Sequence, residues 1–146
     1  MKNFILLLLV GGLIYWGFKE LNAPNATFSS TRKRTTSTDA ILKNAYKSKK
    51  HKLQVQGSGV VIRILSDDLK GSRHQKFIIK LANGQTLLVA HNIDLAPRVV
   101  LKKGDYITFY GEYAWNAKGG VIHWTHHDPK KHHIGGWLKC NGKKYQ

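Results

Sequence analysis

The hydrophobic pattern changes twice along the chain and divides it into four parts. Residues 4–18 are uncharged and mostly apolar, with no polar residues alternating among them. Residues 22–37 are rich in Ser, Thr, Asn and basic side chains, and show no apolar period. From Leu53 onward apolar and polar residues alternate, which predicts strands with one buried face. We predict a hydrophobic N-terminal segment at 1–21, a basic linker with a short helix at 22–52, a β-domain at 53–128 and a basic tail containing His and Gly at 129–146.

Five short strands are predicted within the β-domain. The first is long, and Gly57 and Gly59 allow it to bend or bulge. Asn83-Gly84 predicts a hairpin turn, because both residues tolerate positive φ. Residues 91–98 lack alternation and separate the third strand from the fourth. The predicted strands are residues 53–65, 76–82, 85–90, 106–115 and 121–127.

Five strands with a non-strand crossover after the third follow the order of an OB-fold barrel. The predicted fold class is therefore all-β, a small five-stranded OB-like barrel. A hydrophobic helix, a basic linker and a short helix precede it. An SH3-like barrel and a plain antiparallel sandwich are the alternatives.

The predicted short helix begins near Ser37 or Thr38, either of which can cap it, with Asp39 in its first turn. Ile41 and Leu42 begin an apolar face, and lysines occupy the other faces. We interpret the segment as a small helix that packs against the domain. A basic helix that rests on phosphates or lipid headgroups is the alternative.

The N-terminal apolar segment is short for a membrane span. Its fifteen residues, 4–18, would form a helix of roughly 22 Å, against ~30 Å of hydrocarbon. Tyr15, Trp16 and Lys19 are typical interfacial anchors. We predict an uncleaved membrane anchor through residues 4–18, with a cleaved signal peptide as the alternative.

Two features of the sequence make opposite predictions about the side of the membrane on which the domain lies. A hydrophobic segment at the extreme N-terminus favours export, and so predicts a domain on the periplasmic or extracellular side. Arg32-Lys33-Arg34 after the segment outnumber Lys2 before it, which by positive-inside counting places the domain in the cytoplasm. Export is the first expectation, and the cytoplasmic side stays open.

Charge is concentrated outside the predicted barrel. The chain has 24 Lys and Arg against 8 Asp and Glu, a net charge of +16. Residues 22–52 hold eight basic residues and one acidic residue, and residues 129–146 hold five basic residues and no acid. Residues 53–128 are nearly balanced, with nine basic and six acidic residues. Such an excess attracts polyanions, and the distribution favours attachment by the flanking arms. A purely solubilising arm is the alternative.

The predicted hairpin of residues 111–129 is the segment richest in side chains that can act in catalysis or bind a ligand. If the fifth strand continues to His127, then His123 and His127 share its outer face with Thr125 between them. They could hold Zn or Mn if Asp128 or another neighbour completes the site. Further ligands are available in a set that matches no established zinc signature: His91, Asp94, Glu112, His132 and His133. Hydrogen bonding or aromatic packing of the histidines is the alternative.

Candidate catalytic groups are His91, Asp94 and Glu112. Asp94 could orient the His91 imidazole as a general base, although Asn92 and Asp94 more commonly satisfy turn or cap amides. The chain has no nucleophile elbow, phosphate-binding loop or dinucleotide fingerprint. Its single cysteine, Cys140, excludes an intrachain disulfide.

Two functions from different classes follow. One is a binding module for nucleic acid or an acidic envelope polymer, because OB barrels stack bases on aromatics and follow the backbone with basic groups. The other is a metal-dependent hydrolase, such as a nuclease, that uses the His-rich hairpin. An envelope scaffold that recognises another protein is a third possibility. The candidate ligand-binding residues are Arg98, Tyr110, Tyr113, Trp115 and Lys118.

Three runs also carry a resemblance. Residues 72–77 (SRHQKF), residues 90–98 (AHNIDLAPR) and the 111–129 hairpin together resemble DUF3465, an uncharacterised bacterial family. The resemblance extends roughly from Val55 to Gln146. It implies a small exported or envelope-associated bacterial protein, and it transfers no activity and no catalytic residues.

Overall fold

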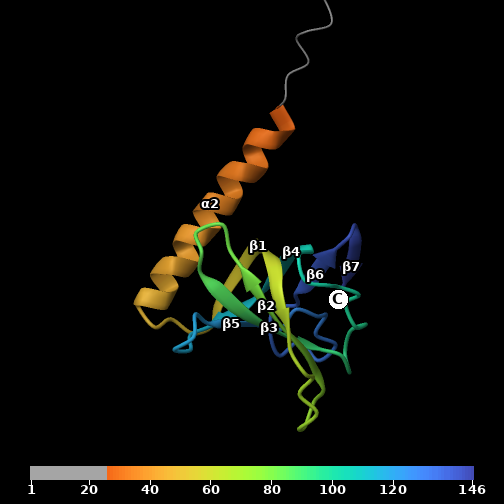
Figure 1. The fold of residues 1–146 in the computed structure, drawn as a ribbon. Helices are drawn as coiled ribbons and strands as arrows, with labels where there is room; N and C mark the ends of the chain where they lie inside the picture. The colour runs from red at the N-terminus through yellow and green to blue at the C-terminus, as the bar shows by residue number, and fades with distance from the viewer. Residues whose placement is uncertain (1–25) are drawn as a thin grey trace, which may run out of the picture. The chain divides into compact units, whose positions relative to one another are not determined.

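The computed structural model describes residues 26–146 and consists mostly of strands, with one helix (Figure 1). Residues 32–146 form one compact unit, which contains all the described strands. The predicted anchor at residues 4–18 lies outside the described residues. Between residues 26 and 146, no helix has the length and apolarity that a membrane crossing requires.

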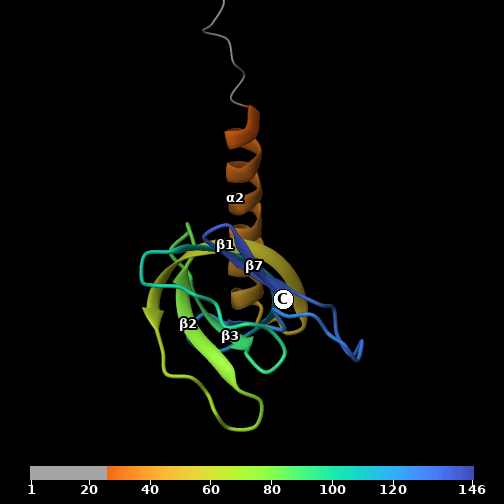
Figure 2. The ribbon, with the colours of Figure 1, turned by 90° about the vertical axis from the view of Figure 1, so that its right-hand side faces the viewer.

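Five strands close into a barrel. β1 (Leu53–Ile64) pairs with β2 (His74–Lys80), which pairs with β3 (Thr86–Asn92). β3 runs parallel to β5 (Val121–His123), and β5 pairs with β4 (Tyr106–Ala114). An antiparallel β4–β1 pairing closes the ring (Figures 1 and 2). This strand order confirms the predicted OB-like barrel.

β1 bends because it belongs to two pairings. Its first part, Leu53 to Val60, follows β4, and its last part, Val60 to Ile64, follows β2. A Cβ on Gly57 would lie 2.6 Å from the Phe109 ring, and a Cβ on Gly59 would lie 2.9 Å from a β2 carbonyl. The glycines therefore permit close approach at the bend, as predicted.

The fifth strand is shorter than predicted. It ends at His123, because Trp124 adopts a left-handed φ of 51°. Strand alternation stops there, and Thr125 and His126 are both buried. The predicted sharing of one face by His123 and His127 is therefore wrong, and His127 is exposed.

The segment 129–146, predicted as a tail, continues the sheet. β6 (Trp137–Cys140) pairs with the first half of β4, and β7 (Lys143–Tyr145) pairs with β6. Asn141-Gly142 joins them, with φ values of 49° and 77°. Such short strands show no clear period, but the Asn-Gly pair is a hairpin signal that the sequence contained.

α2 (Ala26–Lys47) is longer than the predicted helix and covers much of the predicted linker. Neither proline nor glycine occurs between Asn25 and Gln56. Once a helical turn is nucleated, extension through such residues is inexpensive even without an apolar face. The helix does pack against the domain near its C-terminal end, where Leu42 and Ala45 are buried.

The barrel interior and the inner face of α2 form one hydrophobic core. Asp39 accepts a hydrogen bond from the backbone N–H of Asn83, and so attaches α2 to the β2–β3 turn. β6 and β7 add Leu138, Cys140 and Tyr145 to the core. The largest fully buried hydrophobic side chains are Tyr113, Phe77, Phe109, Leu42, Ile79, Leu87, Ile107, Ile122 and Leu138.

Candidate ligand-binding face

An apolar row crosses five strands on the outside of the barrel. Direct pairing aligns Ala114 of β4 with Val121 of β5, and Val121 with Leu88 of β3. Leu88 is opposite Ile78 of β2, which is opposite Arg63 of β1. Directly paired residues project from the same face of a sheet. This set is called the apolar row below, and Arg63 forms its charged end.

A groove of about 300 Å³ lies over the part of this row that Leu88, Ile78 and Arg63 form. Its floor contains Ile78 and Leu88, both half-buried, and its edges contain Arg63 of β1 and Lys118 of the β4–β5 loop. None of its lining residues is acidic. An apolar floor between two exposed cations suits a ligand with planar apolar parts and negative charges.

Lysines extend the positive charge beyond the groove. Lys47, Lys49 and Lys50, called the lysine shelf, are exposed at the end of α2. Lys50 accepts a hydrogen bond at its carbonyl from the Trp115 backbone, and the Lys49 ammonium lies 5.3 Å from the Trp115 ring centroid. The shelf therefore adjoins the β4–β5 loop that carries Lys118, so this part of the basic arm is docked on the barrel.

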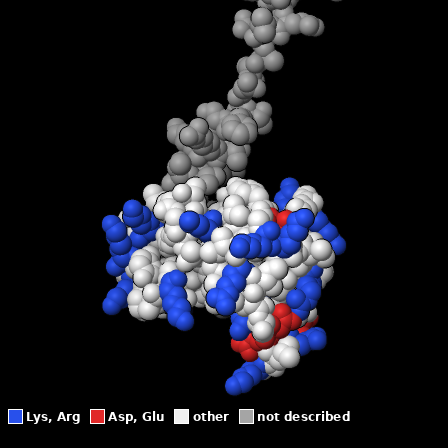
Figure 3. All heavy atoms as spheres, viewed as in Figure 1, with Lys and Arg blue, Asp and Glu red and all other residues white. Residues whose placement is uncertain are grey.

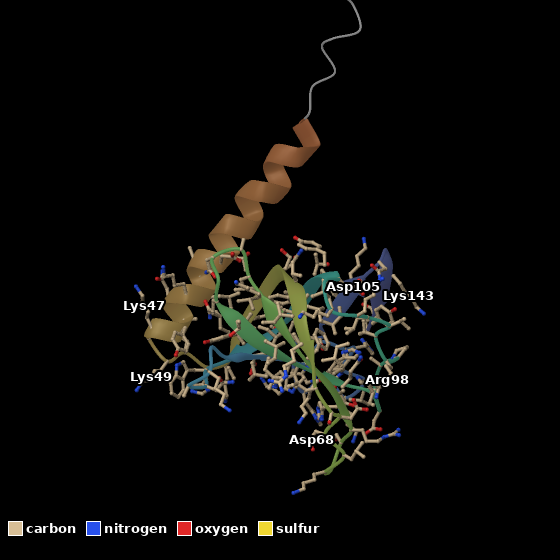
Figure 4. The ribbon with its side chains drawn as sticks, in the orientation of Figure 1. Lys47, Lys49, Asp68, Arg98, Asp105 and Lys143 are labelled. Atoms are coloured by element: carbon tan, nitrogen blue, oxygen red, sulfur yellow. The ribbon has the colours of Figure 1, made fainter. Side chains whose placement is uncertain are left out.

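The surface views are consistent with this placement. Lys47 and Lys49 lie on the left of Figure 4, and the matching edge of Figure 3 carries Lys and Arg with no acidic side chain among them. The main acidic group in that view lies near Asp68, away from the lysine shelf. The sequence has no acidic residue between Asp39 and Asp67.

The β4–β5 loop is held in place by side chains from three elements. The Tyr46 hydroxyl of α2 donates to the Ala117 carbonyl at 3.2 Å. Gln85 donates to the Gly119 carbonyl at 3.0 Å, and the Tyr113 hydroxyl donates to the same carbonyl at 3.4 Å. Lys118 therefore extends from an ordered loop, which lowers the entropy lost when it meets a ligand.

The five predicted ligand-binding residues are not brought together. Lys118 lies in the groove, and Trp115 lies beside the lysine shelf. Arg98 instead forms an ion pair with Asp67. Tyr110 packs against Trp137 of β6, with 6.3 Å between ring centroids. Tyr113 is fully buried, so it cannot stack on a base.

The predicted His91–Asp94 pair does not form. The Asp94 carboxylate accepts hydrogen bonds from the Arg73 backbone N–H at 2.7 Å and from Arg73 Nε at 2.6 Å. These hydrogen bonds lower the pKa of Asp94. His91 is fully buried between the Thr125 hydroxyl at 2.8 Å and the Pro97 carbonyl at 3.1 Å. Burial lowers its pKa to about 4, so a neutral imidazole joins three segments of the fold.

Two histidines that follow β5, His126 and His133, pack together with Trp124. His133 stacks on Trp124 at 4.2 Å and 16°, and meets the His126 ring edge-on at 5.2 Å. Asp128 accepts hydrogen bonds from the Lys130 and His133 backbones. These residues belong to segment 124–136, called the histidine loop. Its neck is closed by a 2.8 Å hydrogen bond from the Gly136 N–H to the His126 carbonyl.

Within residues 26–146 no group of three or more His, Cys, Asp or Glu side chains is arranged to hold a metal ion. His123 approaches Glu112 instead, with 3.3 Å between Nε2 and Oε1. Burial lowers the pKa of both His123 and His126, although Glu112 opposes the shift at His123. The predicted set of His123, His127 and Asp128 is therefore dispersed, and the histidines pack as the alternative interpretation proposed.

Apart from Lys118, the residues that line the groove were not predicted from the sequence. Arg63 and Ile78 belong to strands whose alternation was recognised, but no motif marks them. The available signal was an apolar residue at the outward position of three neighbouring strands, at Ile78, Leu88 and Val121. That signal becomes visible only when the register is known, because pairing brings these positions together.

The sequence model of a family described as "Protein of unknown function (DUF3465)" matches residues 25–146, most of the chain. This match confirms the resemblance carried by residues 72–77, 90–98 and 111–129. A comparison with curated proteins found no match.

Proposed function

The chain belongs to the DUF3465 family, and we propose that it is a module that binds single-stranded nucleic acid. The bound nucleic-acid strand would lie along the outer face of β2, β3 and β5, between Arg63 and the lysine shelf. The groove supports this most directly, because it combines an apolar floor with cationic edges and has no acidic lining.

The apolar floor favours nucleic acid over other polyanions. A polyphosphate or acidic polysaccharide offers charge and hydroxyls, and neither gains from contact with Ile78 and Leu88. Nucleobases present flat, weakly polar faces that replace water on such a floor. The phosphates would then meet Arg63, Lys118 and the lysine shelf, which act at short range and also attract the strand from a distance.

The fold agrees with this placement by analogy. OB barrels bind oligonucleotides and oligosaccharides on the face of strands 2 and 3 and on the loops between strands 1 and 2 and strands 4 and 5. The groove occupies the corresponding face, with β2, β3 and the β4–β5 loop. Fold analogy alone does not establish function, so the proposal depends on the groove.

Fluorescence anisotropy with a labelled oligonucleotide of about 16 nucleotides tests the proposal, since one OB fold covers up to roughly that length. We expect binding that weakens as salt rises. Arg63→Ala and Lys118→Ala should each weaken it, whereas Lys143→Ala should not, because Lys143 does not line the groove and lies away from Lys47 and Lys49 (Figure 4). Competition by polyphosphate or acidic polysaccharide that equals competition by the oligonucleotide would contradict a specific role for the apolar floor. Absence of binding at low salt would refute the function.

A further inference from the structure

Glu112 is the only acidic residue in the seven described strands. It lies on the outward side of β4, next to Ala114 of the apolar row on the same face. A carboxylate beside a polyanion site repels phosphates. A ligand group that contacts the Glu112 carboxylate must therefore donate a hydrogen bond and carry no negative charge.

Two polar side chains flank Glu112 across the sheet. Gln54 of β1 is its direct partner on one side, and His123 of β5 is its direct partner on the other. The three project from the same face, and we call them the polar row. The apolar row is its neighbour, because Ala114 and Val121 are each two residues away along the same strands.

The polar row is incomplete in the free protein. Gln54 Nε2 and His123 Nε2 are both enclosed, and neither has a hydrogen-bond partner among the described residues. Nε2 of His123 lies 3.3 Å from Glu112 Oε1, close enough for an ion pair but without a hydrogen bond. Enclosed donors are rarely left unpaired. With the His123 proton on Nε2, the row presents a donor, an acceptor and a donor.

We propose that the polar row reads a uracil or thymine base of the bound strand, which rests on the proposed nucleic-acid function. The edge of this base presents a carbonyl oxygen, an N–H and a second carbonyl oxygen, the complement of the row. Gln54 and His123 donate to the two oxygens, and Glu112 accepts from N3–H. Both flanking side chains are half-buried, and binding requires a rotamer change that turns their enclosed nitrogen atoms toward the base.

The other bases complement the row less well. Cytosine places an unprotonated ring nitrogen where the carboxylate needs a donor. Adenine does the same and offers no carbonyl oxygen. Guanine supplies N1–H to Glu112 but places an amino group, not an oxygen, beside one of the two donors. One unpaired donor or one repulsive contact is enough to separate the bases by binding affinity.

The test compares two oligonucleotides that differ only at N3. One is oligothymidylate, and the other carries N3-methylthymidine, which keeps the backbone and the ring but lacks the N–H. We expect the methylated strand to bind the wild-type chain about tenfold more weakly, as for the loss of one base contact. In Glu112→Ala the two strands should bind equally. Asp94→Ala, which removes an acid outside the row, should keep the difference.

Three results overturn the proposal. Equal binding of both strands by the wild-type chain would show that N3–H is not read, while leaving nucleic-acid binding intact. A full difference that persists in a folded Glu112→Ala variant would show that another group reads it. Absence of binding to every oligonucleotide would overturn both this inference and the proposed function. Thermal melting of the variant confirms folding, and the methylated strand tests the wild-type chain regardless.

Discussion

The apolar row and the histidine loop offer opposite lessons about where a site lies. The histidine loop holds many chemically able side chains in 13 residues, 124–136. The rings of Trp124, His126 and His133 pack on one another, and the Asp128 carboxylate accepts hydrogen bonds from the backbone. The apolar row contains mostly ordinary aliphatic residues, yet it is open to solvent and bordered by Arg63 and Lys118.

The difference lies in what each group already contacts. A histidine whose nitrogen atoms bind a hydroxyl and a carbonyl, as His91 does, has no capacity left for a ligand. An outward Ile78 or Leu88 has apolar surface that no neighbour covers fully. Side chains that no neighbour already occupies therefore identify a binding face better than a high density of reactive residues does.

The largest expected effect is on stability, at His91. His91→Ala should lower the free energy of unfolding by roughly 3 kcal/mol, because it leaves a cavity and removes the partner of the Thr125 hydroxyl. Urea denaturation measures this loss. His127→Ala, at an exposed position of the histidine loop, should change stability by less than about 0.5 kcal/mol. A loss below about 1 kcal/mol for His91→Ala would contradict a structural role.

The second-largest expected effect is a loss of stability in acid, caused by the buried histidines. The pKa of His91 is about 4 in the folded chain against an ordinary value of 6.5. Because the unfolded chain binds the proton first, stability is full above pH 6.5 and falls as the pH drops toward 4, by about 3 kcal/mol. Burial of His123 and His126 acts in the same direction.

Urea denaturation at a series of pH values between about 7.5 and 4 measures this effect. The His91→Ala variant should show a shallower dependence on pH, since it lacks the largest contributor. An unchanged stability across this range in the wild-type chain would mean that the buried imidazole accepts a proton freely.

On the binding face, stability should change little and affinity should change clearly. Arg63→Ala and Lys118→Ala each remove one phosphate contact, which should lower the slope of log affinity against log salt by about 0.7. Anisotropy titrations at several salt concentrations give that slope. A slope identical to that of the wild-type chain would place the phosphates elsewhere.

The smallest effect is expected from lysines on the histidine loop. Lys130 and Lys131 are exposed there. The double change Lys130→Ala and Lys131→Ala should alter oligonucleotide affinity by less than about threefold, because screening limits distant charges. A larger loss than that caused by Arg63→Ala would reverse the comparison between the two regions.

Much of the fold could be predicted from the sequence. Alternation from Leu53 and the Asn83-Gly84 turn locate the barrel strands, because each is a local property of the chain. The end of β5 could not be predicted, since it depends on the left-handed Trp124. The extent of α2 was also missed, because its first turns lack an apolar face.

The candidate site was less predictable than the fold. Lys118 was identified from its place in a turn, and Glu112 from its chemistry. Tyr113 was assigned to the ligand, although one-residue alternation on β4 places it inside. The apolar row and the polar row depend on which strands are neighbours and in which register, and the sequence does not state that pairing. The chemistry of single residues could be predicted from the sequence, whereas the sets of residues that strand pairing brings together could not.

The most direct test of the central claim is amide chemical-shift mapping of the full chain with a single-stranded oligonucleotide. We expect shifts concentrated at Arg63, Ile78, Leu88 and Lys118 and in the lysine shelf, with the histidine loop largely unchanged. Shifts concentrated in residues 124–136, with the groove unaffected, would contradict it.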